Sequence, residues 1–154
     1  MSSLKNISPR KIILVADDEE SLRTLIHTTL DNPEWRILLT GDGMEALALA
    51  RQELPDLAIL DWMMPGLTGL EVSRELRVEP RTAGIPVLFL TARSQAQDMA
   101  QGLESGAVAF LTKPFSPLQL LEEVRRVLNA RPATEENHGS LAKLGAPLRV
   151  AQKA

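Results

Sequence analysis

The stretch LAILDWMMPG, residues 57–66, decides the fold. Four apolar residues lead into Asp61, which is followed at once by Trp62, two methionines, a proline and a glycine. A short apolar run without alternation is typical of a strand that is covered on both faces, as in a parallel sheet. A carboxylate at the end of such a strand is a helix cap, a ligand or a nucleophile. The rest of the chain must decide between these three roles.

Four more short apolar runs occur along the chain, and stretches with helical spacing separate them. The runs are KIILVA (11–16), WRILLT (35–40), PVLFL (86–90) and AVAFLT (107–112), and the helical stretches are residues 19–30, 43–54, 69–77, 94–106 and 116–130. Strict alternation of strand and helix predicts an α/β fold, a doubly wound parallel sheet of five strands with helices on both faces. In such folds ligands bind at the carboxyl ends of the strands.

Composition narrows the classes of protein that need to be considered. A chain of 154 residues is long enough for one domain with a core, and its net charge of −3 argues against a nucleic-acid surface. The chain has no cysteine, which excludes disulfides and thiolate metal sites, and it has no apolar run of membrane-spanning length, so we expect a cytoplasmic protein. We interpret residues 1–10 as an N-terminal extension, 11–130 as the folded domain and 131–154 as a flexible tail or a truncated linker.

Chemically active residues follow four of the five predicted strands. They are Asp17 and Asp18, Asp61, Thr91 and Lys113. Taken singly, each of these residues is explained as a helix cap or a turn residue. Independent caps would not leave three acids and one base on one edge of a sheet.

The chemistry of this cluster points to phosphoryl transfer. Three close carboxylates repel one another unless a cation lies among them, and oxygen ligands without His or Cys suit Mg²⁺. A carboxylate beside Mg²⁺ can act as a nucleophile toward phosphorus. The Lys113 ammonium and the Thr91 hydroxyl could then stabilise the incoming phosphoryl oxygens.

Four motifs carry a family resemblance. ILVADDEE (13–20), AILDWMMPGLTGLE (58–71), VLFLTAR (87–93) and GAVAFLTKPF (106–115), in this order and spacing, resemble the receiver domain of bacterial response regulators. The resemblance covers about residues 11–130. It implies a flavodoxin-like (βα)5 fold, similar to CheY, with the strand order 2-1-3-4-5.

The resemblance also implies roles for particular residues. Asp61 would accept a phosphoryl group from the phosphohistidine of a sensor histidine kinase or a phosphotransfer protein. Asp17, Asp18, Asp61 and the backbone carbonyl of Met63 would hold Mg²⁺, with Asp18 as the better candidate for a direct ligand. Lys113 would pair with Asp61, and its bond to Pro114 is usually cis in this family.

A conformational switch is a further implication of the resemblance. Thr91 and Phe110 occupy its two switch positions, and the face formed by the fourth helix, the fifth strand and the fifth helix should change most. Met63 and Arg93 occupy the positions that tune dephosphorylation. A bulky thioether and a long cation should hinder the attacking water, so we predict a longer-lived phosphorylated form than in fast chemotaxis members.

The sequence says less about the binding partners and the downstream target of this domain than about its fold and its site. We expect a protein target downstream, with no nucleic acid or membrane contact within this chain, and an activity limited to its own phosphorylation and dephosphorylation. A phosphorylation-dependent dimer is a further expectation, although Val108 and Ala109 stand where many relatives carry acids that form charged pairs across the dimer face. The alternatives are a receiver fragment of a larger regulator whose output domain is absent, an aspartyl-phosphate phosphatase on the same fold, and a flavin carrier.

Overall fold

The computed structural model describes residues 9–92, 99–129 and 149–151. Strands and helices alternate along the described chain. The elements are β1 (Lys11–Ala16), α2 (Glu20–Thr29), β2 (Trp35–Thr40), α3 (Gly43–Glu53), β3 (Leu57–Asp61), α4 (Gly69–Val78), β4 (Val87–Ala92), α5 (Met99–Glu104), β5 (Ala107–Lys113), a helix at residues 117–129, and β6 (Arg149–Ala151).

The strands form one parallel sheet in the order β2-β1-β3-β4-β5-β6. The five predicted strands and their order 2-1-3-4-5 are therefore confirmed. Three of them run slightly further than expected, so that Asp61, Thr91 and Lys113 belong to the last residues of strands instead of following them.

A sixth strand extends the sheet beyond the five predicted ones. β6 pairs in parallel with β5, so that Val150 lies opposite Phe110. Its residues, 149–151, lie within the predicted tail, so the prediction of a tail without structure is wrong for these three residues. Three residues are too few for a periodic signal, whereas an edge strand such as β5 offers unpaired backbone groups to any extended segment within reach.

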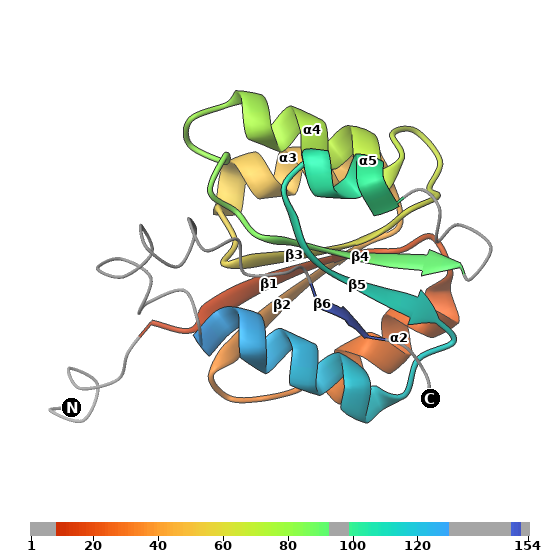
Figure 1. The fold of residues 1–154 in the computed structure, drawn as a ribbon. Coiled ribbons are helices and arrows are strands. Elements are labelled where there is room, and N and C mark those ends of the chain that lie inside the picture. The colour runs from red at the N-terminus through yellow and green to blue at the C-terminus, as the bar shows by residue number, and fades with distance from the viewer. Residues whose placement is uncertain (1–8, 93–98, 130–148, 152–154) are drawn as a thin grey trace, which may run out of the picture.

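Helices cover both faces of the sheet (Figure 1). Helices α3, α4 and α5 lie on one face, and α2 lies on the other together with the helix at residues 117–129, which is blue in the figure. Each layer has its own apolar core, and all five residues of the central strand β3 are buried. This double cover explains why the strands consist of continuous apolar runs instead of alternating ones.

Local hydrogen bonds fix where the helices begin. The Asp42 carboxylate accepts the backbone N–H groups of Met44 and Glu45 at the start of α3. Thr68 and Glu71 form a capping box at the start of α4, so the loop after β3 ends at a defined residue. These caps hold the loops at the carboxyl edge of the sheet, where the candidate site lies. None of the helices in the described ranges is long and apolar enough to cross a membrane.

Candidate functional site

The predicted site residues meet at the carboxyl edge of the sheet. Asp17 and Asp18 follow β1, Asp61 ends β3, Thr91 lies near the end of β4, and Lys113 ends β5. Asp17 is fully buried and Asp61 nearly so, whereas Asp18 is exposed. Parallel strands bring these residues together because their carboxyl ends all point to one edge.

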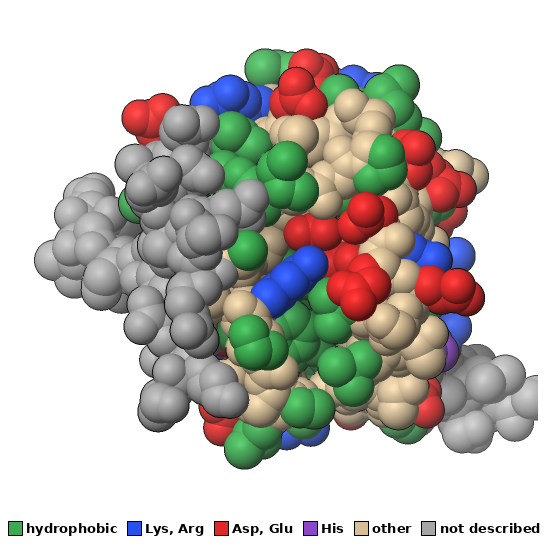
Figure 2. All heavy atoms as spheres, turned by 90° about the vertical axis from the view of Figure 1, so that its right-hand side faces the viewer, with side chains coloured by type: hydrophobic (Ala, Val, Ile, Leu, Met, Phe, Trp, Pro, Cys, Tyr) green, Lys and Arg blue, Asp and Glu red, His purple; other side chains and the backbone are tan. Residues whose placement is uncertain are grey.

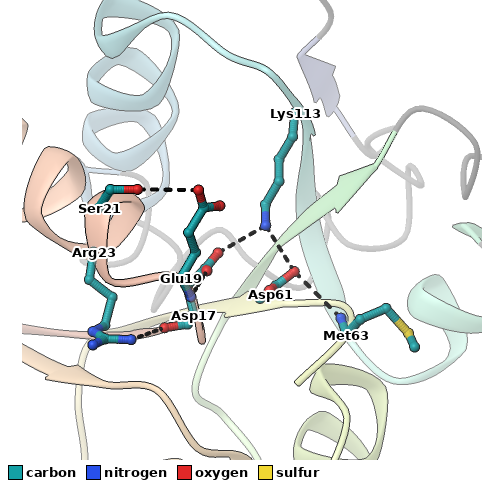
Figure 3. Close-up of polar contacts among 7 residues, drawn as sticks. All are labelled: Asp17, Glu19, Ser21, Arg23, Asp61, Met63 and Lys113. Carbon is teal, nitrogen blue, oxygen red and sulfur yellow. Dashed lines mark hydrogen bonds and ion pairs between the residues drawn. The ribbon is translucent and has the colours of Figure 1, made fainter. Parts of the chain in front are cut away.

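Lys113 connects two of the three acids (Figure 3). Its Nζ lies 3.0 Å from Oδ2 of Asp17 and 3.2 Å from Oδ1 of Asp61. Burial alone would lower the pKa of Lys113, but the neighbouring carboxylates of Asp61 and Asp17 together raise it above its usual value. Lys113 is therefore a permanent positive charge between two buried acids. The peptide bond from Lys113 to Pro114 is cis, as predicted.

The environment of Asp61 shifts the pKa of its carboxyl group. Burial and the nearby charge of Asp17 raise its pKa to about 6, against the opposing effect of Lys113. The backbone N–H of Met63 also points to Asp61 Oδ1 at 3.4 Å. A carboxylate whose pKa is shifted by burial and by specific charged neighbours is a candidate functional residue.

Asp17 is held on every side. Its Oδ1 accepts the backbone N–H of Glu19 at 2.9 Å. Glu19 is the N-cap residue of α2, which has no side-chain cap hydrogen bond, so the capping role considered for Asp17 is not confirmed. Its backbone carbonyl accepts a hydrogen bond from Nη1 of Arg23 at 2.7 Å. Arg23 is not among the site residues predicted from the sequence, and the one sequence signal for it is its place on the helix that directly follows the acidic pair.

The three acids suit a divalent cation. Oxygen atoms from Asp17, Asp18 and Asp61 all lie within 4.8 Å of one another. One ammonium group, that of Lys113, offsets their charge among the side chains that the structure describes here. Oxygen donors from a few carboxylates, one of them exposed and open to water, fit Mg²⁺. The carbonyl role predicted for Met63 stays a prediction.

The two predicted switch residues are buried. Thr91 is 1% exposed, and its hydroxyl has no hydrogen-bond partner among the described residues. The Phe110 ring is fully buried and lies beside Phe89, with ring centroids 5.6 Å apart. It also contacts Gly102 so closely that a Cβ atom there would lie 2.5 Å from the ring. The Phe110 ring therefore packs directly against α5 at Gly102.

Of the two predicted dephosphorylation residues, the structure describes one. The side chain of Met63 is 55% exposed and extends away from the Asp61 carboxylate in Figure 3. Arg93 lies outside the described residues.

The face that carries the site combines charge with apolar surface. Figure 2 shows acidic side chains and a basic one gathered in the middle of this face, with hydrophobic side chains around them. A pocket of about 320 Å³ opens beside the site and is lined by Glu19, Leu22, Leu25, Lys113, Pro114 and Phe115. The site thus lies beside a pocket whose lining combines apolar side chains with the charged groups of Glu19 and Lys113.

Comparison with known proteins agrees with this geometry. The model of the response regulator receiver domain matches residues 13–125. The phosphate regulon transcriptional regulatory protein PhoB of Pseudomonas aeruginosa is 39% identical over 118 residues, which are 77% of this chain and 52% of PhoB. This chain thus spans about half the length of the curated relatives it matches.

Solved structures show the same fold. The chemotaxis response regulator CheY4 of Vibrio cholerae is 34% identical with a TM-score of 0.72, over 77% of this chain and 99% of CheY4. The receiver domain of a sensor histidine kinase from Pseudomonas aeruginosa is 28% identical with a TM-score of 0.71, over 78% of this chain and 98% of that domain, and it holds a magnesium ion in its active site cleft. The chain therefore belongs to the receiver domains of two-component response regulators.

Proposed function

We propose that this receiver domain takes a phosphoryl group onto Asp61 from a histidine kinase or a phosphotransfer protein, with Mg²⁺ bound at the acidic cluster. Receiver domains take their phosphoryl group from histidine kinases. The observation that carries the proposal is the placement of Lys113 Nζ between Asp17 and Asp61, in a site where three carboxylates converge within 4.8 Å. A helix cap needs no such partner, whereas phosphoryl transfer needs both a nucleophile and a cation.

Each side chain has a task in the transfer. A carboxylate oxygen of Asp61 attacks the phosphorus, so that a P–O bond forms while the P–N bond breaks and its electron pair stays on the donor imidazole. Lys113 is within reach of both acids and would follow the new negative charge onto a phosphoryl oxygen. Thr91 brings a buried hydroxyl without a partner among the described residues, which is free to donate to another phosphoryl oxygen.

The metal would be held by Asp17, Asp18, Asp61 and the backbone carbonyl of Met63. Asp18 is the exposed member of the set, and the Asp17 carboxylate is already engaged on both oxygens, which favours Asp18 as the direct ligand. Bound there, Mg²⁺ supplies positive charge that stabilises the phosphoryl oxygens during transfer.

The surroundings of the site support a protein phosphodonor. The pocket beside Lys113 is lined by apolar side chains, among them Leu22, Leu25 and Phe115. A helix that carries a phosphohistidine would place apolar residues one turn away from it, on the same face. Such a helix can cover this pocket while its phosphoryl group reaches Asp61.

The consequence of phosphorylation would be a change of surface. The phosphoryl group adds charge and acceptor oxygens next to Thr91, and movement of Thr91 leaves space for Phe110, whose ring contacts α5. The face formed by α5, β5 and the helix at residues 117–129 would then present a new surface to a protein target or a second copy of the chain. On this account the chain catalyses its own phosphorylation and dephosphorylation and signals through that surface.

Intact-mass spectrometry after incubation with acetyl phosphate tests the proposal. Wild type should gain one phosphoryl group with Mg²⁺ and none in EDTA, and Asp61→Asn should gain none. Asp31→Asn, which removes an exposed acid away from the site, is the matched control and should be modified like wild type. If wild type stays unmodified, the assay is repeated with a phosphorylated kinase, and failure there as well contradicts the proposal.

A further inference from the structure

Arg23 reaches back from α2 onto the acidic loop (Figure 3). Its Nη1 donates a hydrogen bond of 2.7 Å to the backbone carbonyl of Asp17. That carbonyl belongs to the peptide unit between Asp17 and Asp18, the two acids that follow β1. Arg23 therefore fixes the part of the backbone that carries both side chains of the acidic pair.

The same peptide segment is fixed from other directions as well. The backbone N–H of Asp17 donates to the Thr40 carbonyl at 3.0 Å, and its two carboxylate oxygens contact the Glu19 N–H and Lys113. The carbonyl of Asp17 is the remaining polar group of this residue, and Arg23 is its partner. Without the guanidinium, the turn that leads to the exposed Asp18 loses the hydrogen bond that the Asp17 carbonyl accepts from Arg23.

Gly41 makes room for this contact. A Cβ atom at position 41 would lie 2.6 Å from Arg23 Nη1 and 3.5 Å from the Asp17 carbonyl oxygen. The guanidinium thus occupies the space that any larger residue would fill in the loop between β2 and α3. Since the arginine side chain is flexible, an alanine at this position would displace the guanidinium instead of breaking the fold.

We infer that Arg23 is a positioning residue for the acidic site, whose guanidinium, seated against Gly41, holds the Asp17–Asp18 turn in the conformation that binds Mg²⁺. The inference rests on the proposed function, because it assigns a residue to the metal site of that function. Groups that orient metal ligands without touching the metal affect affinity strongly, since a loose ligand must be ordered on binding.

The charge of Arg23 and its hydrogen bond to the turn predict opposite changes in Mg²⁺ affinity when Arg23 is removed, so a measurement can decide between them. A guanidinium bound to the backbone of the acidic pair repels a second cation nearby, so if charge alone mattered, its removal would strengthen Mg²⁺ binding. If Arg23 acts by holding the turn, its removal weakens Mg²⁺ binding. Gly41→Ala separates the two effects further, because it displaces the guanidinium from the Asp17 carbonyl without removing the charge.

Titration of the whole chain with Mg²⁺, followed by backbone amide NMR without a phosphodonor, measures this affinity directly. Arg23→Ala and Gly41→Ala should each weaken Mg²⁺ binding by about tenfold, as removal of outer partners of metal ligands does elsewhere. The double variant should be no weaker than either single variant, because both changes break the same contact. With acetyl phosphate, the variants should need more Mg²⁺ but reach the wild-type rate once Mg²⁺ saturates the site.

Two matched controls accompany these variants. Arg74→Ala removes an exposed arginine on α4, and Gly84→Ala adds a Cβ that meets nothing within 4 Å. Both should bind Mg²⁺ like wild type.

Equal or tighter Mg²⁺ binding by Arg23→Ala and Gly41→Ala would overturn the inference and leave the proposed function intact. Absence of Mg²⁺ binding by wild type would contradict the proposed function and the inference with it. If Arg23→Ala does not fold, Gly41→Ala decides alone.

Discussion

The ammonium of Lys113 lies 3.2 Å from the carboxylate of Asp61, and this ion pair favours the charged form of the candidate nucleophile at the edge of the core. Burial and Asp17 raise the pKa of Asp61 to about 6, and Lys113 opposes them. The site is thus a balance in which two buried acids share one cation. Removal of any one of these three charged groups should therefore shift the pKa values of its neighbours in a predictable direction.

Lys113→Met should raise the pKa of Asp61 above about 6, because it removes the charge that favours the carboxylate. It should also destabilise the fold by about 1–2 kcal/mol at neutral pH, since Asp17 and Asp61 are left without their cation. Carboxyl ¹³C NMR in EDTA and urea denaturation measure the two effects. Lys113→Arg, which keeps the charge, is the control and should move both quantities less. An unchanged Asp61 titration in Lys113→Met would show that the ion pair has no electrostatic effect.

Asp61→Asn should stabilise the metal-free protein, and the gain should grow with pH. The folded pKa of about 6 lies above the unfolded value of 3.8, so the folded state holds the proton more tightly. Ionisation of Asp61 therefore costs wild type stability as pH rises through this window, while the asparagine variant avoids the cost. We expect about 1–2 kcal/mol in favour of the variant at pH 8 and little difference near pH 4.

Urea denaturation in EDTA across this pH range checks the Asp61→Asn prediction. Glu122→Gln removes an exposed acid on the helix at residues 117–129 and should show no comparable pH-dependent gain. A gain for Asp61→Asn that stays constant from pH 4 to pH 8 would mean that Asp61 does not titrate in this window.

Thr91→Val should leave the unphosphorylated protein as stable as wild type or about 1 kcal/mol more stable. The reason is that the Thr91 hydroxyl is buried without a hydrogen-bond partner among the described residues. After phosphorylation, the variant should lose the change in amide signals of β5 and α5 that wild type shows. Thermal denaturation and amide spectra with acetyl phosphate measure the two parts.

Thr82→Val provides the matched control for this change. The Thr82 hydroxyl is equally buried but donates to the Leu76 carbonyl at 2.7 Å, so its loss should destabilise the fold by about 1–2 kcal/mol. If Thr82→Val destabilises the fold while Thr91→Val leaves its stability unchanged or raises it, the result would support an unsatisfied hydroxyl at Thr91. A retained phosphorylation response in Thr91→Val would exclude Thr91 from the switch.

Met63→Asn should shorten the lifetime of the aspartyl phosphate severalfold. Met63 is exposed next to the nucleophile, and a small polar side chain there should admit and orient water better than a thioether does. Loss of the phosphoryl mass over time, after removal of the donor, measures the rate. Met44→Asn changes another exposed methionine and should leave the rate unchanged. Arg93→Glu, at the second predicted position, belongs in the same assay. If neither variant nor the pair decays faster, these positions do not limit hydrolysis.

The sequence was sufficient for the fold and for most of the site. Apolar runs at 11–16, 35–40 and 57–60 became strands with nearly the predicted bounds, because strands buried on both faces admit little but apolar residues. The position of Asp17, Asp18, Asp61 and Lys113 at strand ends then placed them on one edge, since all the strands run in parallel. The resemblance to receiver domains implied the order of the strands and the cis bond before Pro114.

Contacts between distant loops could not be predicted in this way. The hydrogen bond from Arg23 to the Asp17 carbonyl, and the fit of that guanidinium against Gly41, depend on how the loops after β1 and β2 pack beside each other. The same holds for β6, which adds to the edge of β5 through backbone hydrogen bonds that carry no residue pattern.

The sequence by itself determined which residues form the five strands β1 to β5, which edge gathers the acids, and which aspartate ends the central strand, because apolar runs and chain order are local properties. The tertiary structure alone decided that Lys113 is shared between Asp17 and Asp61, that the Asp61 carboxyl is buried enough to bind its proton up to about pH 6, and that Arg23 secures the acidic turn. Distance and desolvation set these properties, and both arise only when segments far apart in the chain pack together.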